Sequence, residues 1–329
     1  MEIVPVEPDG PRYDEWYDVY RLCDTYDREG GALPMSRHEL SVLLRWPMPK
    51  SEKRAYALLD DGVVVAGGFL YLHLVDNTNR AEIELWTHPD HGRRGHGSQM
   101  LAHLEQVAAG EGRTVLGVEV PWTLESEEPV GCRASFMSKH GYELVLADVQ
   151  RRLALPVAEE RLAELMPDLD GYTMRTWTGP VPDELVAEWA DVVASLDTEA
   201  PTGDLDYEAV TPDIEEIRSG ERMSQEQKRV SVAAVAVRGD GRLAAYSEIY
   251  VGAEDPIAYQ WGTLVRREDR GHRLGLAVKV ANLRVLQDGF AHVSSVSTYN
   301  AASNVHMIAV NEALGFVPTE RLGEFQKHL

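Results

Sequence analysis

Apolar and polar residues follow a pattern along this chain that occurs twice. In the first half, two strand-like apolar runs flank Asp61-Gly62, a dipeptide typical of a tight hairpin turn. In the second half, two similar runs flank Asp240-Gly241. We therefore expect one antiparallel hairpin in each half of the chain.

The elements that follow each hairpin also occur in the same order. A third apolar strand, at 81–87 or 258–265, runs into a loop rich in Gly, Arg and His that opens an amphipathic helix. A further strand, a helix and a Gly-aromatic pair come next in each half. Gly95 and Gly275 in the two loops are separated by nearly the same stretch of chain as the two hairpin turns. The pattern therefore indicates a duplicated unit.

The repeat sets the expected domains and fold class. We expect an α+β protein with one domain over residues 1–155, a connector over 156–171 and a second domain over 172–329. Each domain should hold a mixed, mostly antiparallel sheet flanked by helices. Two domains of about 150 residues are an ordinary division for a chain of 329.

Charge and composition narrow the function classes. The formal net charge of −22 argues against nucleic acid partners, because those rest on Lys and Arg neutralising phosphates. It favours cationic substrates, or simply a solvated acidic surface. No apolar run is long enough to span a membrane, the N-terminus does not resemble a secretion signal, and the two cysteines have no metal-ligand spacing. We expect a cytoplasmic protein, monomeric or homodimeric, with no metal, membrane or nucleic acid partner.

The two glycine-rich loops are the main candidate binding sites. Backbone N–H groups converge where a strand meets a helix N-terminus, and the helix dipole adds to them, so such a loop suits phosphate. A dinucleotide-binding fold is the main competitor, but antiparallel hairpins precede both loops here. The second loop lies in a basic island, with five Lys or Arg residues in the window 266–279. The candidate phosphate-binding residues are Arg93, Arg94, Gly95, His96, Gly97 and Ser98 in the first loop, and Arg270, Gly271, His272, Arg273, Leu274, Gly275, Leu276 and Ala277 in the second.

These loops resemble the signature of the GNAT acyltransferase superfamily, Gln/Arg-x-x-Gly-x-Gly/Ala. The fit pairs Gly95 with Gly275, and it leaves Gly92 and His272 where Gln or Arg is expected. The doubled pattern is similar to the mycothiol synthase-like paired GNAT proteins of actinobacteria. The resemblance implies acetyl-CoA as donor, with its pyrophosphate at the loop and its pantetheine along the fourth strand beside Leu264 and Val265. It also implies a cofactor contact at Asn304.

Acyl transfer to an amine needs a base, because an alkylammonium titrates near pH 10.4. In the family a Glu on or near the fourth strand commonly has this role. The first half offers Glu82 and Glu84, which share one face of a strand, and the second half offers Glu248 on the preceding strand. The family's usual acid, a Tyr on the last helix, is replaced by Met137 and Asn311, and Tyr299 or His306 are possible substitutes. Each carboxylate could also be a solvated strand residue.

The acceptor is the least determined part of the prediction. Five acids lie between residues 197 and 208, which would attract a cationic amine but would equally suit a solvated turn. We expect an acetyl-CoA-dependent N-acetyltransferase with one catalytic domain, more readily the C-terminal one. A non-catalytic acyl-CoA-binding protein is the alternative, and an aminoacyl-tRNA-dependent enzyme of the same fold is disfavoured by the charge.

Overall fold

The computed structural model describes residues 1–28 and 30–329, and the side chain of Asp197 lies outside this description. The strands are β1 (Glu2–Val6), β2 (Ser51–Asp60), β3 (Val63–His73), β4 (Arg80–Thr87), β5 (Val115–Trp122), β6 (Glu143–Ala154), β7 (Tyr172–Thr178), β8 (Arg229–Arg238), β9 (Leu243–Gly252), β10 (Ile257–Val265), β11 (Ser295–Ala301) and β12 (Val317–His328). The helices are α1 (Tyr13–Thr25), α2 (Arg37–Arg45), α3 (His96–Gly110), α4 (Gly131–Lys139), α5 (Glu159–Leu165), α6 (Val186–Ala194), α7 (Leu196–Glu199), α8 (Ile214–Glu226), α9 (Leu274–Gly289) and α10 (Val305–Leu314), with the short 3-10 turns η1 (Pro89–His91) and η2 (Arg267–Asp269).

Both expected hairpins are present. Strands β2 and β3 pair antiparallel around Asp61 and Gly62, which have φ angles of 49° and 82°. Strands β8 and β9 pair antiparallel around Gly241, with φ of 90°. These left-handed conformations are the ones that the Asp-Gly dipeptide favours. The α+β fold predicted from the repeated pattern is confirmed.

The chain divides into two compact units, and each unit is built from more than one segment of the sequence. Unit 1 comprises Met1–Leu146, Asp204–Tyr207 and Leu322–Leu329. Unit 2 comprises Ala147–Gly203 and Glu208–Arg321. The domain limits expected from the sequence, 1–155 and 172–329 with a connector over 156–171, stay a prediction.

Unit 1 has helices on both faces of its sheet. Side chains of α3 and α4, such as Leu101 and Met137, pack with Leu70 and Ile83 from one face. Side chains of α1 and α2, such as Trp16 and Leu40, pack on the other face. Ser36 caps the N-terminus of α2, because its hydroxyl and backbone form a reciprocal capping box with Glu39.

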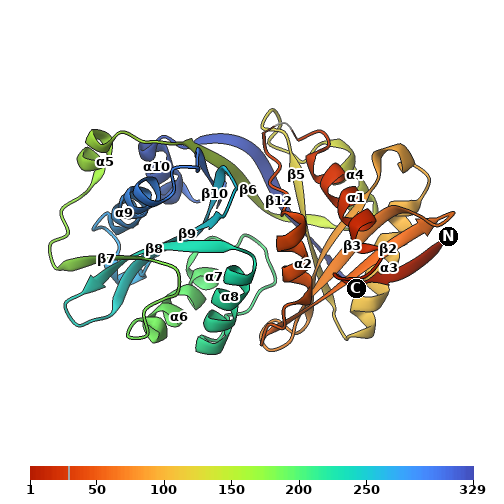
Figure 1. The fold of residues 1–329 in the computed structure, drawn as a ribbon, viewed down its shortest axis with the longest axis horizontal. Helices are drawn as coiled ribbons and strands as arrows, with labels where there is room; N and C mark the ends of the chain where they lie inside the picture. Colours follow the sequence, from red (N-terminus) through yellow and green to blue (C-terminus); the bar gives the residue numbers. More distant parts are fainter. Residues whose placement is uncertain (29) are drawn as a thin grey trace. The chain divides into compact units, whose positions relative to one another are not determined.

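Unit 2 repeats this arrangement. Helices α5, α9 and α10 cover one face of the sheet, where Leu276 and Leu314 pack with Ile249. Helix α6 covers the other face, where Trp189 packs with Tyr246 and Leu264. Figure 1 shows α9 and α10 in blue on one side of β8 and β9, and α6 to α8 in green on the other.

The last strand of each half belongs partly to the other unit. The strand order in unit 1 is β1-β2-β3-β4-β5, followed by residues 322–328 of β12. In unit 2, residues 148–154 of β6 pair antiparallel with β11, and the order continues β11-β10-β9-β8-β7. Each unit therefore completes its sheet with a strand from the opposite half of the sequence.

Membrane-spanning helices were also sought. Among residues 1–28 and 30–329, none of the helices is both long and apolar enough to cross a bilayer.

Candidate functional site

The loop between β10 and α9 has the backbone shape of an anion cradle. Gly271 and Arg273 have φ angles of 93° and 57°, and α9 begins directly afterwards at Leu274 without a side-chain cap. A Cβ on Gly275 would lie 3.4 Å from Cγ2 of Val265 at the end of β10. The first-turn N–H groups of α9 therefore have no side-chain cap, which suits a phosphate ligand.

The loop between β4 and α3 has the same shape, and it corrects the register of the repeat. Its left-handed residues are Arg93 and Gly95, which take the places of Gly271 and Arg273 in the second loop. In each loop the helix begins at the residue after the second of these, at His96 for α3 and at Leu274 for α9. The pairing of Gly95 with Gly275 in the expected signature is therefore wrong.

In the corrected register Gly97 corresponds to Gly275, and Gly92 corresponds to Arg270. Both Gly97 and Gly275 lie against the end of their preceding strand, at Thr87 and Val265 respectively. The second loop thus carries Arg270 where the signature expects Gln or Arg. Only its central glycine is replaced, by Arg273 in the left-handed conformation.

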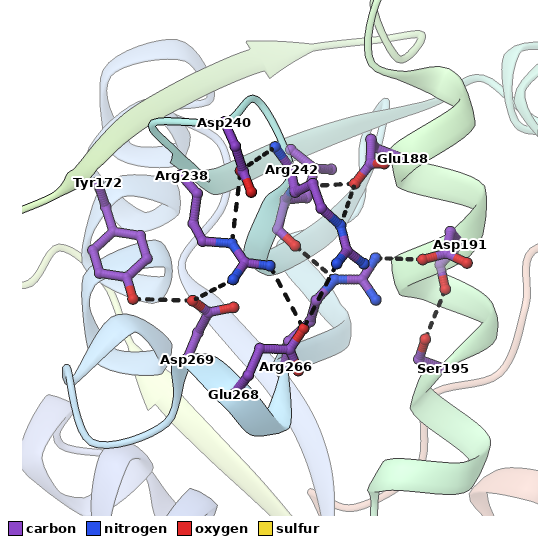
Figure 2. Close-up of polar contacts among 11 residues, drawn as sticks. Tyr172, Glu188, Asp191, Ser195, Arg238, Asp240, Arg242, Arg266, Glu268 and Asp269 are labelled. Carbon is purple, nitrogen blue, oxygen red and sulfur yellow. Dashed lines mark hydrogen bonds and ion pairs between the residues drawn. The ribbon is translucent and has the colours of Figure 1, made fainter.

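An ion-pair network holds the start of the second loop (Figure 2). Arg266 is buried, donates to the carbonyl oxygen of Leu243 and pairs with Asp191 at 2.5 Å. Asp269, only 2% exposed, accepts a hydrogen bond from the Tyr172 hydroxyl at 3.0 Å and faces Arg238. These contacts tie η2 to the β8–β9 hairpin, so the loop is fixed by charges that the hydrophobic pattern does not reveal.

The other arginines of the basic island differ in whether a carboxylate of the protein already pairs with them. Arg270 pairs with Glu199 at 2.9 Å. Arg267 and Arg273 are exposed, and neither forms an ion pair with any residue that the structure describes. The side chains free to meet an anionic ligand are therefore Arg267 and Arg273, together with exposed His272.

Strand β10 carries a bulge directly opposite Glu248. Gln260 pairs with Ile249 and Thr263 with Ser247, so Trp261 and Gly262 together oppose one residue of β9. A Cβ on Gly262 would lie 2.2 Å from Oη of Tyr246, so only glycine fits there. A bulge leaves the extra residue out of the backbone ladder.

The side chain of Gln260 stabilises this bulge through hydrogen bonds to β9. Its Nε2 donates to Oγ of Ser247 at 2.9 Å and to the carbonyl oxygen of Glu248 at 2.7 Å. Strand β10 carries no carboxylate, and Gln260 is not among the site residues predicted from the sequence. Its role in holding the bulge becomes visible only with the strand register.

Glu248 has the character of a base that works near neutral pH. It is 8% exposed, and burial raises its pKa to about 7, although a hydrogen bond from the Tyr250 hydroxyl opposes that rise. Tyr250 lies two residues further along β9, on the same face. A carboxyl with this pKa is half ionised near pH 7, which suits proton abstraction there.

The carboxylates of the first half are placed differently. Burial would raise the pKa of Glu82, but His73 and Arg80 outweigh it and lower that pKa. Desolvation by the surrounding protein, and then Glu119, raise the pKa of Glu84 to about 8, although its side chain is exposed to solvent. The pKa therefore does not distinguish Glu84 from Glu248, but solvent exposure does, because the Glu84 side chain is exposed and Glu248 is only 8% exposed. Strands β3 and β4 pair without a register shift from Ala66 to Leu72.

The last helix of unit 2 holds an amide at the position where the resemblance to GNAT proteins implies a tyrosine. Asn311 is fully buried, accepts a hydrogen bond from Nζ of Lys279 at 2.8 Å and donates to Asn300. Burial lowers the pKa of Lys279 to about 7. Asn304 caps α10 by accepting from the backbone N–H of Met307.

The two candidates for the acid, Tyr299 and His306, lie on β11 and α10. Tyr299 accepts a hydrogen bond from Gln150 at 2.6 Å, and His306 is exposed at the start of α10. The sequence counted Lys279 among the five basic residues of the window 266–279, but its burial at 2% exposure removes it from the charges that could meet an anionic ligand there.

The acidic segment 197–208 contributes residues to both units. Glu199 is engaged with Arg270 in unit 2. Asp204 and Asp206 belong to unit 1, where the backbone carbonyl of Asp206 accepts a hydrogen bond from Arg80. The Arg80 guanidinium also lies 5.2 Å from the Tyr207 ring. The side chains of Asp204, Asp206 and Glu208 are exposed, and attraction of a cationic amine by this segment stays a prediction.

The comparisons of this sequence with known protein sequences both match it to acetyltransferases. Residues 13–128 match the model of the acetyltransferase (GNAT) family. The chain is 26% identical to a mycothiol acetyltransferase of Thermomonospora curvata, over 91% of this chain and 89% of that protein.

Solved structures show the fold over the whole chain. A tandem GNAT protein from the clavulanic acid biosynthesis pathway superposes with a TM-score of 0.82 at 28% identity, over 99% of this chain and 98% of that one. A GCN5-related N-acetyltransferase from Sphaerobacter thermophilus superposes with a TM-score of 0.65 at 16% identity, over 99% and 95% of the two chains. The tandem form expected from the repeat is confirmed.

Proposed function

We propose that this chain, a tandem N-acetyltransferase of the GNAT family, transfers an acetyl group from acetyl-CoA to a primary amine in its C-terminal half. One observation carries the choice of half: the buried carboxyl of Glu248 lies opposite the β10 bulge. The first half has no such bulge between Ala66 and Leu72, and its Glu82 is bound by Arg80.

The donor would bind at the loop before α9. Acetyl-CoA would supply an activated acyl group as a thioester. The uncapped N–H groups of α9 and the exposed Arg267 and Arg273 suit its pyrophosphate. The small Gly275 allows close backbone approach. Leu264 and Val265 would lie beside the pantetheine, and the first loop remains a second candidate donor site.

The chemistry follows from the groups around the bulge. Glu248 takes a proton from the ammonium form of the acceptor, so that the neutral nitrogen can attack the thioester carbonyl carbon. A backbone N–H freed by the bulge at Trp261 and Gly262 stabilises the negative charge on the carbonyl oxygen. The thiolate leaves with a pKa near 8.5 by analogy with cysteine, so acid assistance is not compulsory.

The alternative is a protein that binds acyl-CoA without turning it over, which the loss of the usual tyrosine at Asn311 and Met137 would suit. Thiol release from acetyl-CoA, measured with a panel of primary amines, separates the two. We expect amine-dependent release. Tight CoA binding by calorimetry with no release for any amine would support the alternative. A monomer or homodimer in the cytoplasm, and the absence of a metal, stay predictions from the sequence.

A further inference from the structure

Four residues of unit 2 form a straight row across its sheet. Tyr250 of β9 pairs with Tyr259 of β10, Tyr259 is in register with Ser297 of β11, and Ser297 pairs with Arg152 of β6. Residues in register on neighbouring strands point to the same side of a sheet. The four side chains therefore share one face.

This face is the one that presents Glu248. The alternate residues on the same strands, such as Ile249, Val296 and Leu153, are buried with α9 and α10 on the opposite face. Glu248 lies two positions from Tyr250, so it points to the same side as the row. The row thus runs from the proposed base, past Tyr259, to Arg152.

The far end of the row holds donors with no protein partner. Ser297 is fully buried, and its Oγ has no hydrogen-bond partner among the residues that the structure describes. Arg152 is half-buried, its Nε and Nη2 are enclosed without a partner, and it forms no ion pair within the described chain. Enclosed donors without acceptors are costly, above all on a cation.

Resting on the proposed function, we infer that Arg152 and Ser297 form a subsite for a carboxylate carried by the amine acceptor. Cross-strand partners have Cβ atoms about 5 Å apart, so the hydroxyl and the guanidinium can donate to one anionic group. A guanidinium fork matches the two oxygens of a carboxylate. The acceptor is then an amino acid or a related amino carboxylate, rather than the polycation that the acidic composition suggested.

The geometry also sets the direction of the acceptor. Three strand spacings of about 4.8 Å separate β9 from β6. The amine end lies toward Glu248, the carboxylate end toward Arg152, and the aromatic ring of Tyr259 lies between them. The Tyr299 ring, 6.1 Å from that of Tyr259, extends the same wall.

The test compares matched amines with and without a carboxylate. The pairs are β-alanine and ethylamine, 6-aminohexanoate and pentylamine, and lysine and cadaverine. For at least one pair, we expect the wild-type kcat/KM to favour the carboxylate by tenfold or more. Arg152→Ala should bring that ratio to about one. Arg152→Lys and Ser297→Ala should give intermediate ratios. The control Arg284→Ala removes a cation of α9 that pairs with Glu159, and it should leave the ratio unchanged.

Binding of the same pairs, measured by saturation-transfer NMR without acetyl-CoA, separates this inference from the proposed function. Acetyl transfer with no preference for a carboxylate, or a preference that survives in folded Arg152→Ala, overturns the subsite. If no amine is acetylated, the proposed function fails, and the NMR binding measurements alone then test the subsite. Carboxylate binding lost in Arg152→Ala supports the subsite, and equal or absent binding overturns it.

Discussion

At the scale of single residues, the burial of Glu248 is the feature with the largest consequence. A carboxyl enclosed by protein is unfavourable in its charged form, which is why its pKa rises to about 7. The native protein therefore keeps a proton that the unfolded chain has already lost. Its contribution to stability is fully present below about pH 4.3 and is lost as the pH rises to about 7.

Replacing Glu248 by Gln should therefore stabilise the fold at alkaline pH only. The amide is neutral in both states, so the free energy of unfolding should gain up to about 3 kcal/mol at pH 8 and little at pH 4.5. Urea unfolding at the two pH values measures this. The exposed Glu254→Gln is the control and should show no such difference. Equal effects of Glu248→Gln at both pH values would contradict the raised pKa.

At the scale of elements, the two glycine loops should differ in how they bind CoA. A Cβ at Gly275 would already touch Cγ2 of Val265 at 3.4 Å, so a branched side chain there would displace the first turn of α9 from the end of β10 and disturb the N–H groups proposed to bind phosphate. We expect Gly275→Val to weaken CoA binding at least tenfold in calorimetry, and Gly275→Ala to weaken it less. Gly97→Val, the matched change in the first loop, should reduce only the number of sites. Unchanged affinity in the doubly substituted protein would exclude both loops.

Local elements could be predicted from the sequence because local patterns determine them. The Asp-Gly hairpins and the strand–loop–helix units at 81–110 and 258–289 follow from turn chemistry and hydrophobic period. The register of the second loop could not be found by matching glycines, because Arg273 occupies a left-handed position that usually favours glycine. The bulge at Gly262 and the Arg152–Ser297 pair depend on strand register, which one sequence does not reveal.

At the scale of the whole molecule, the exchanged last strands tie the two halves of the sequence together. Phe325 of β12 is 2% exposed and packs in the core of unit 1 with Tyr142 and Val118. Residues 148–154 complete the sheet of unit 2. Periodicity cannot predict this exchange, because each strand has the same pattern whichever sheet it joins.

Removing residues 322–329 should therefore destabilise the N-terminal half of the chain. We expect the core of unit 1 to lose hydrogen-exchange protection, for example at β3 and β4. The milder Phe325→Ala should cost about 3–5 kcal/mol. Deleting only the exposed Leu329 is the control. Full protection of β3 and β4 in the shortened chain would show that 322–329 is dispensable to unit 1.

The most direct test of the central claim is the pH dependence of acetyl transfer in two matched variants, Glu248→Gln and Glu84→Gln. The wild-type kcat/KM should rise with pH through about 7, as Glu248 ionises. Glu248→Gln should lose about 10²-fold or more at pH 7 and recover toward pH 10, where the amine deprotonates unaided. Glu84→Gln should retain the wild-type profile. A full rate in Glu248→Gln at pH 7, with the loss in Glu84→Gln instead, would move catalysis to the first half and contradict this account.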